Sequence, residues 1–282
     1  MGSISEALAK AESILGTNGI AEPRREAASL VMLAIEKEKT FLYAHSDYEL
    51  TELESSRFES LLERRAAREP LQYISGVQEF YGLEFEVTPD VLIPRPETEI
   101  LVEHAIELLK SQPLQRFCEI GVGSGCISIS ILHHLPSASA IGLDVSTSAL
   151  NVARRNSEKL GVCERLQFVE SDVFEKTPDE RFDMIVSNPP YVPSIDIEGL
   201  QPEVRDFEPH LALSDGRDGL SIISRIVGQA PRFLKSGGFL LMEIGFNQSP
   251  LVVGMFESGI WRATELFPDL QGIPRVVCSE LI

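Results

Sequence analysis

Residues 96–282 alternate between strand patterns and helix patterns, and this alternation restricts the fold more than any other feature of the chain. Short apolar runs are each followed by a segment with apolar residues at helical spacing. Strands that alternate with helices in this way form a mostly parallel, doubly wound α/β sheet. The last two strands are close enough in sequence to pair as an antiparallel hairpin at one edge. The seven predicted strands cover residues 115–120, 139–145, 165–173, 182–191, 237–245, 260–267 and 275–282.

The first 75 residues show three helical patterns and no strand pattern. Thr51 followed by Glu54 has the spacing of a capping box at a helix start. Aromatic and β-branched residues punctuated by glycine and proline then predict a β-hairpin within about residues 77–93. We therefore expect a helical-bundle substrate-recognition domain, a hairpin linker and a catalytic domain, at residues 1–75, 76–95 and 96–282. The predicted helices of the first domain cover residues 4–16, 23–38 and 51–69.

The charge balance is unfavourable for a nucleic-acid partner. The chain has 43 Asp and Glu against 25 Lys and Arg, a formal net charge of −18. Such a surface disfavours affinity built on phosphate neutralisation. The basic cluster Arg64, Arg65 and Arg68 is expected to be a solvated helix end.

Neither a membrane span nor a metal site is predicted. No stretch approaches the roughly 18 uninterrupted apolar residues of a membrane helix, and the first residues lack a secretion-signal pattern. The cysteines have no metal-ligand spacing, and Cys118 and Cys126 lie in apolar runs typical of buried thiols. These features predict a cytoplasmic protein without a metal ion.

A glycine-rich turn follows the first strand of the alternating region. Glycines at such a turn let the backbone approach a ligand closely and leave amide N–H groups pointing outward. The dinucleotide fingerprint G-x-G-x-x-G would need glycine at position 126, where Cys126 stands. The carboxylate of Glu119 would repel a pyrophosphate but suits a cationic amino-acid head group, which favours S-adenosylmethionine over NAD. A tight turn without a ligand is the alternative. The candidate cofactor-binding residues here are Glu119, Gly121, Val122, Gly123, Ser124 and Gly125.

Two further acidic residues stand at the ends of the next two strands. Asp144 lies 23 residues after Gly121 and can accept hydrogen bonds from both hydroxyls of a ribose. Its alternative role is to cap the helix that begins near Ser146. Asp172 can accept a hydrogen bond from an adenine amino group, and Val173 can pack on the ring face. The sequence therefore predicts nucleoside contacts at these two strand ends.

The fourth strand runs into Asn188-Pro189-Pro190-Tyr191, the strongest single motif of the chain. The prolines stop the strand ladder and stiffen the loop. A planar –NH2 group is a poor nucleophile because its lone pair is delocalised. The Asn188 side-chain oxygen and the Pro189 carbonyl can each accept one of its N–H groups, and Tyr191 can stack on its plane. The motif predicts methyl transfer to a glutamine amide, adenine N6 or cytosine N4.

These motifs together resemble the protein-(glutamine-N5) methyltransferases that modify peptide chain release factors. The resemblance covers nearly the whole chain, and LIPRPETE at residues 92–99 is its most specific segment. It implies a Rossmann-like class I methyltransferase that methylates the glutamine of the Gly-Gly-Gln motif in release factors. It also implies S-adenosylmethionine as donor, S-adenosylhomocysteine as product, and docking of the factor by the N-terminal module and the hairpin. We further expect a monomer that binds neither nucleic acid nor membrane.

The resemblance also assigns roles to individual residues. It implies cofactor contacts for Gly121 to Gly125, Asp144, Val173 and Asn188, and substrate contacts for Asn188, Pro189, Pro190 and Tyr191, of which Asn188, Pro189 and Tyr191 are the catalytic candidates. Relatives often carry tryptophan where Val173 stands, so stacking on adenine should be weaker or come from Phe174. Arg95 and Glu97 are expected either to contact the cofactor or to form a salt bridge and a helix start.

Three alternatives share parts of this pattern. A glutamine methyltransferase acting on a ribosomal protein would carry the same motifs. An adenine-N6 nucleic-acid methyltransferase would share the Asn188-Pro189-Pro190-Tyr191 motif, but it should carry a basic groove or a large recognition insertion. A catalytically silent binding protein would need neither this motif nor the glycine turn.

Overall fold

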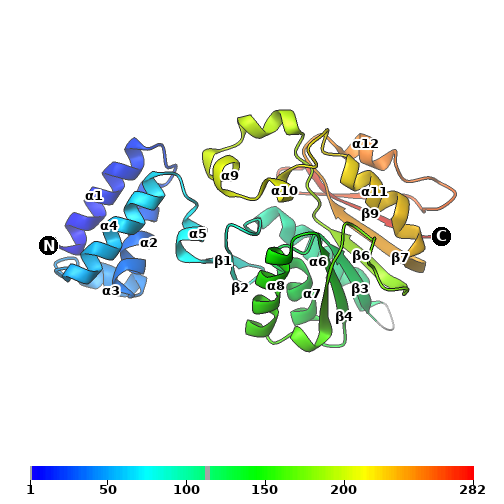
Figure 1. Ribbon diagram of the computed structural model, residues 1–282, viewed down its shortest axis with the longest axis horizontal. Helices are drawn as coiled ribbons and strands as arrows, with labels where there is room; N and C mark the ends of the chain where they lie inside the picture. The colour runs from blue at the N-terminus through cyan, green and yellow to red at the C-terminus, as the bar shows by residue number, and fades with distance from the viewer. Residues whose placement is uncertain (1, 112–114) are drawn as a thin grey trace. The chain divides into compact units, whose positions relative to one another are not determined.

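The computed structural model describes residues 2–111 and 115–282, which pack as two compact units (Figure 1). The first unit comprises the chain up to Gly76 together with Gln201–Phe207. The second comprises Val77–Leu200 and Glu208–Ile282. The hairpin, predicted as a separate linker, thus packs with the second unit, and the first unit includes a short helix from much later in the chain.

The first unit is a helical bundle around its own apolar core. Ser3 with Glu6 and Thr51 with Glu54 form capping boxes that start α1 and α4, the second of which the sequence predicts. The helices bury apolar side chains such as Leu30 in a shared cluster. The three predicted helices are confirmed, and the three short helices α3, α5 and α9 were not predicted. The elements are α1 Ile4–Thr17, α2 Pro23–Ile35, α3 Lys39–Ala44, α4 Glu52–Ala66, α5 Leu71–Ser75 and α9 Pro202–Phe207.

Arg65 is buried in this bundle, so the expectation of a solvated helix end is wrong for this residue. Only 4% of it is exposed, and its guanidinium pairs with the carboxylates of Glu26 and Glu203. Arg68 also reaches Glu203, over 2.5 Å. Two acidic partners that lie far apart in the sequence compensate the buried charge, and sequence spacing gives no sign of them.

Replacing Arg65 by alanine should therefore lower the free energy of unfolding by about 3 kcal/mol, because the poorly solvated carboxylate of Glu26 loses its counter-charge and that of Glu203 keeps only Arg68. Arg64→Ala is the matched control: its partner is Glu69, its side chain is 42% exposed, and the expected loss is under about 1 kcal/mol. Urea denaturation followed by circular dichroism measures both. Equal losses in the two variants would contradict the prediction.

The second unit contains the predicted seven-stranded sheet, in the order β5-β4-β3-β6-β7-β9-β8. The first five strands along the chain pair in parallel, and β9 pairs antiparallel with both β7 and β8. The doubly wound, mostly parallel fold with an antiparallel edge is therefore confirmed. The strands are β3 Arg116–Ile120, β4 Ser139–Asp144, β5 Leu166–Glu170, β6 Phe182–Ser187, β7 Leu234–Glu243, β8 Glu265–Pro268 and β9 Pro274–Glu280.

Helices cover both faces of this sheet, with α6, α7 and α8 on one face and α11 and α12 on the other (Figure 1). Side chains along a strand alternate between the two faces. In β6, Met184 and Val186 accordingly join the core with α6 and α7, whereas Ile185 joins the core with α11. The helices are α6 Glu99–Lys110, α7 Cys126–His134, α8 Thr147–Lys159, α10 His210–Leu213, α11 Ser221–Gln229 and α12 Ser249–Val253. Short 3-10 helices occupy η1 Pro96–Thr98, η2 Cys163–Arg165, η3 Ser194–Gly199 and η4 Ala230–Arg232.

The hairpin is shorter than predicted and is fastened to α8. Its strands are β1 Val77–Phe80 and β2 Leu83–Glu86, and the chain beyond Glu86 is irregular up to η1. Buried Asn156 donates to the Glu86 carbonyl over 3.0 Å and accepts from the Glu86 amide over 2.7 Å. The same Nδ2 donates to the Ser124 carbonyl over 2.9 Å. One asparagine therefore links the hairpin to the glycine turn.

No helix of the described residues is long and apolar enough to cross a membrane.

Candidate functional site

A cavity of about 830 Å³ lies in the second unit, at the carboxyl ends of β3, β4, β5 and β6. Doubly wound sheets bind ligands at this edge. The four loops that follow these strands bring together most of the candidate site residues, and Gly125 and Tyr191 are the two that do not line the cavity. The candidates that do line it are Glu119, Gly121, Val122, Gly123, Ser124, Asp144, Asp172, Val173, Asn188, Pro189 and Pro190.

The glycine turn after β3 needs glycine for backbone reasons. Gly121, Gly123 and Gly125 have φ of 73°, 53° and 84°, in the left-handed region that side chains disfavour. A Cβ at Gly125 would lie 2.7 Å from Ile129 Cδ1 and 3.3 Å from Ala153 Cβ. Gly125 therefore lets α7 and α8 pack closely behind the turn.

Most of the turn's amides are satisfied within the protein, contrary to the expectation that they point outward. The amides of Gly121 and Val122 donate to the Leu143 carbonyl over 2.8 and 3.1 Å. The Gly125 amide donates to Val122, and the Gly123 amide donates to Asp144 Oδ2 over 2.9 Å. The turn is thus not a cradle of free amides for a phosphate group, which agrees with the argument against a dinucleotide.

Glu119 is fully buried and lines the cavity with one carboxylate oxygen unpaired. Its Oε2 accepts from the Ser128 amide over 2.9 Å, whereas Oε1 has no hydrogen-bond partner among the described residues. Burial raises the pKa of this carboxyl to about 8. A buried acceptor without a partner is uncommon and fits a site that receives a donor from a ligand.

Asp144 is held by two backbone amides at the end of β4. Gly123 donates to Oδ2 and Ser146 donates to Oδ1, each over 2.9 Å. The cap of α8 is Ser146, whose side chain accepts from the Ala149 amide, so the alternative role of Asp144 as the N-cap is wrong. Each carboxylate oxygen has a further lone pair. Asp144 can therefore accept two more hydrogen bonds from a ligand in the cavity.

Of the three residues after β5 that were expected to contact the cofactor, two line the cavity and Phe174 does not. Asp172 and Val173 line the cavity, and Arg225 on α11, also in the lining, pairs with Asp172 over 3.0 Å. Phe174 is 3% exposed and stacks on Phe233 in the core with a centroid distance of 4.6 Å, so Phe174 does not supply a contact in place of the missing tryptophan. Val173 has a φ of 52°, a left-handed backbone conformation that is strained for a β-branched residue. Strained backbone of this kind clusters at functional sites.

The loop after β6 carries Asn188, Pro189 and Pro190 into the cavity lining. The Asn188 side chain donates through Nδ2 to Thr98 Oγ1 over 3.2 Å. A Cβ at Gly121 would lie 3.8 Å from the Asn188 carbonyl oxygen, so this loop and the glycine turn are in close contact. The two motifs that the sequence places 67 residues apart are therefore neighbours in one cavity.

Tyr191, the last residue of this motif, does not line the cavity. Its hydroxyl donates to Glu243 Oε1 over 3.1 Å, and a Cβ at Gly245 would lie 3.0 Å from its ring. The predicted stacking of Tyr191 on a planar substrate group thus has no counterpart in this arrangement. Burial raises the pKa of Glu243, while hydrogen bonds from Thr98 and Tyr191 act in the opposite direction.

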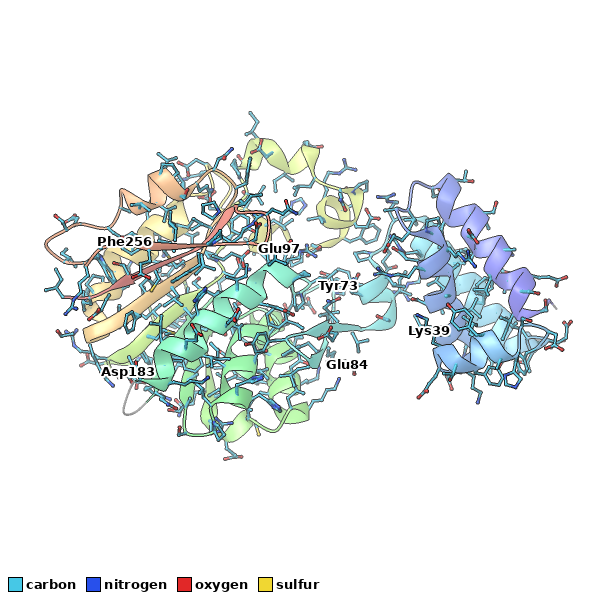
Figure 2. The ribbon with its side chains drawn as sticks, turned by 180° about the vertical axis from the view of Figure 1, so that it is seen from behind. Lys39, Tyr73, Glu84, Glu97, Asp183 and Phe256 are labelled. Atoms are coloured by element: carbon cyan, nitrogen blue, oxygen red, sulfur yellow. The ribbon has the colours of Figure 1, made fainter. Side chains whose placement is uncertain are left out.

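Arg95 and Glu97 belong to the segment that leads into α6. Arg95 lines the cavity and pairs with buried Glu208 over 2.5 Å, so it forms the salt bridge that is one of its two predicted roles. Glu97, labelled in Figure 2, lies in the 3-10 turn η1 and does not line the cavity. Asp183, also labelled there, lies at the opposite, amino-terminal end of β6.

The segment between Tyr191 and α11 also lines the cavity, which was not predicted. It forms the turn η3 and the short helix α10, and both contribute to the lining. Its short helices lack a sustained apolar period, so no sequence signal marked them. The residues concerned are Ser194, Ile197, Glu198, Pro209, His210, Leu211, Ala212, Ser214, Asp215 and Gly216.

No group of three His, Cys, Asp or Glu side chains within residues 2–111 and 115–282 is placed to hold a metal ion.

Both units of the chain are similar to known protein families. Residues 6–76 match the family described as PrmC N-terminal domain, and residues 96–199 match the Methyltransferase small domain family. The release factor glutamine methyltransferase of Geobacter sulfurreducens is 43% identical over 263 residues, 93% of this chain and 91% of the relative. A protein of the same name from Cereibacter sphaeroides is 41% identical over 277 residues, 98% of each chain.

One solved structure is similar to this chain in its fold alone. The hMettl16 catalytic domain in complex with MAT2A 3′UTR hairpin 6 has a TM-score of 0.58 and is 17% identical, covering 77% of this chain and 82% of that chain.

Proposed function

Because the chain belongs to the family of release factor glutamine methyltransferases, we propose that it methylates the glutamine of the Gly-Gly-Gln motif in peptide chain release factors, at the side-chain amide nitrogen. The donor is S-adenosylmethionine. The observation that carries the proposal is one cavity lined by both the glycine turn after β3 and the Asn188 loop after β6.

The residues at the strand ends fit this cofactor. Glu119 Oε1, buried and unpaired, suits the cationic amino group of the methionine part. Asp144 has lone pairs left for the two ribose hydroxyls, and Val173 offers an apolar contact to adenine beside Asp172. When bound, the cofactor supplies an electrophilic methyl group for in-line displacement and leaves as S-adenosylhomocysteine.

The Asn188 loop holds the acceptor nitrogen. The Asn188 side-chain oxygen and the Pro189 carbonyl each accept one N–H of the substrate amide, which directs the nitrogen lone pair at the methyl carbon. As the new N–C bond forms, positive charge develops on the nitrogen, and the two oxygens stabilise it more strongly than they stabilise the neutral amide. One of the two protons then leaves to solvent, so no strong base is required.

Asp144→Ala should weaken cofactor binding about tenfold to a hundredfold, because two hydrogen bonds to a charged acceptor are lost. Asp144→Asn keeps one acceptor oxygen, so its affinity for the cofactor should lie between that of Asp144→Ala and that of the wild type. Calorimetric titration of the cofactor into each protein measures the dissociation constants. Unchanged affinity in Asp144→Ala would overturn the ribose assignment.

Methyl transfer from labelled S-adenosylmethionine to an intact, unmodified release factor tests the function itself. A factor with its motif glutamine replaced and a DNA duplex are the controls. We expect label on the unaltered factor alone. Label on DNA would instead favour the adenine-N6 alternative, and label only on a ribosomal protein offered in parallel would favour the sister enzyme. The same proposal places the protein in the cytoplasm as a monomer, beside its substrate.

A further inference from the structure

A hydrogen-bonded chain of three side chains, Asn188, Thr98 and Glu243, lies beneath the Asn188 loop. Thr98 and Glu243 are each 2% exposed. Thr98 Oγ1 donates to Glu243 Oε2 over 2.6 Å, and Asn188 Nδ2 donates to Thr98 Oγ1 over 3.2 Å. Thr98 stands at the start of α6, Asn188 follows β6, and Glu243 ends β7.

The sheet register brings the two ends of this chain together. Ser187 on β6 pairs with Met242 on β7, so Asn188 and Glu243 are the next residues along these two neighbouring strands. The turn η1 then places Thr98 between them. Three segments that are far apart in the sequence thus meet under the loop that lines the cavity.

The hydroxyl of Thr98 determines which end of the Asn188 amide faces it. A threonine hydroxyl has one hydrogen and two lone pairs. Because the hydrogen is directed to the Glu243 carboxylate, only lone pairs face Asn188, and Asn188 must present its NH2 group. The carboxamide oxygen is therefore directed away from Thr98, where it is available to the cavity that Asn188 lines.

We propose that Glu243, acting through Thr98, is a positioning residue that fixes the flip of the Asn188 carboxamide so that its oxygen faces the substrate amide. The inference rests on the proposed function. With the opposite flip, the NH2 of Asn188 would face the NH2 of the substrate, and neither group could accept a hydrogen bond. The same carboxylate also accepts from Tyr191, so it anchors both ends of the Asn188–Tyr191 loop.

Thr98→Val tests this role, because valine keeps the shape of threonine but cannot accept from Asn188. Thr98→Ser keeps the hydroxyl and is the rescue variant. Ser130→Ala removes another buried hydroxyl, one that lies on α7 outside the cavity lining, and is the matched control. The measurements are kcat and KM for an intact release factor, the cofactor dissociation constant, and the resonances of the Asn188 side-chain amide in the substrate-free protein labelled with 15N-asparagine.

We expect Thr98→Val to lower kcat about tenfold to a hundredfold, as misplacement of a group near the reaction does, with cofactor affinity unchanged. The Asn188 amide protons should shift upfield as their hydrogen bond is lost. Thr98→Ser should restore both readouts, and Ser130→Ala should change neither. Wild-type kcat in Thr98→Val, a change confined to KM, or unshifted Asn188 resonances would overturn the inference. A wild-type protein that methylates no release factor would refute the proposed function, while the resonances would still test the amide orientation.

Discussion

Asn188→Ala should lower turnover by a factor on the order of 10³ while leaving the fold intact and cofactor affinity within a few-fold of wild type. Removing one preorganised group that stabilises charge developing in a transition state costs about that much. The side-chain oxygen of Asn188 is the only acceptor that the variant deletes, because the Pro189 carbonyl belongs to the backbone. The loss should therefore appear in kcat, measured with labelled cofactor and saturating release factor.

Asn188→Asp is the informative companion to the alanine variant. Aspartate keeps one side-chain oxygen. Its second oxygen replaces the NH2 group that donates a hydrogen bond to Thr98, and this oxygen would lie close to the carboxylate of Glu243. Like charges at short range disfavour this arrangement. We expect it to be nearly as inactive as Asn188→Ala. Near-normal turnover in the alanine variant would refute the mechanism, and full activity in Asn188→Asp would show that the oxygen needs no fixed orientation.

The parts of the site that follow strand ends could be predicted from the sequence. The alternation of strands and helices predicts a parallel sheet, and the carboxyl ends of parallel strands meet at one edge. Residues such as Glu119, Asp144 and Asn188 could thus be assigned to one cavity without knowledge of their distances, and all three line it. Their chemical roles stay predictions until the variants are measured.

Contacts between segments far apart in the sequence could not be predicted. Thr98 and Glu243 carry no local pattern that marks them, since their importance comes from strand register and from the position of η1. Tyr191 looked like a ligand contact because it ends a ligand-edge motif, yet its hydroxyl is directed to Glu243. Arg65 looked solvated because its neighbours are charged, whereas its two partners lie 39 and 138 residues away.

The contact between the loop around Gly219 and the Tyr191 carbonyl could not be predicted either, because it too joins segments that are far apart in the sequence. Gly219 has φ of 76°, and a Cβ built on it would lie 2.1 Å from the Tyr191 carbonyl oxygen and 2.7 Å from its carbonyl carbon. Gln248 Nε2 donates to that same carbonyl over 2.9 Å. Asp215 fixes the loop by accepting from the amides of Gly219 and Ser221, over 3.0 and 2.8 Å. Gly219 therefore has no room for a side chain, and the backbone opposite it is held in place.

Gly219→Ala should therefore push the Tyr191 carbonyl out of its hydrogen bond with Gln248 and displace the Asn188 loop. The left-handed backbone and the overpacking each cost about 1–3 kcal/mol, so a lower melting temperature is expected together with a fall in kcat of about a hundredfold or more. Gly161→Ala is the matched control, because Gly161 has φ of 72° but nothing within 4 Å of the added Cβ. Gly161→Ala should lower the melting temperature but leave kcat unchanged. Equal kcat values in the two variants would mean that the close approach of Gly219 to Tyr191 does not position the catalytic loop.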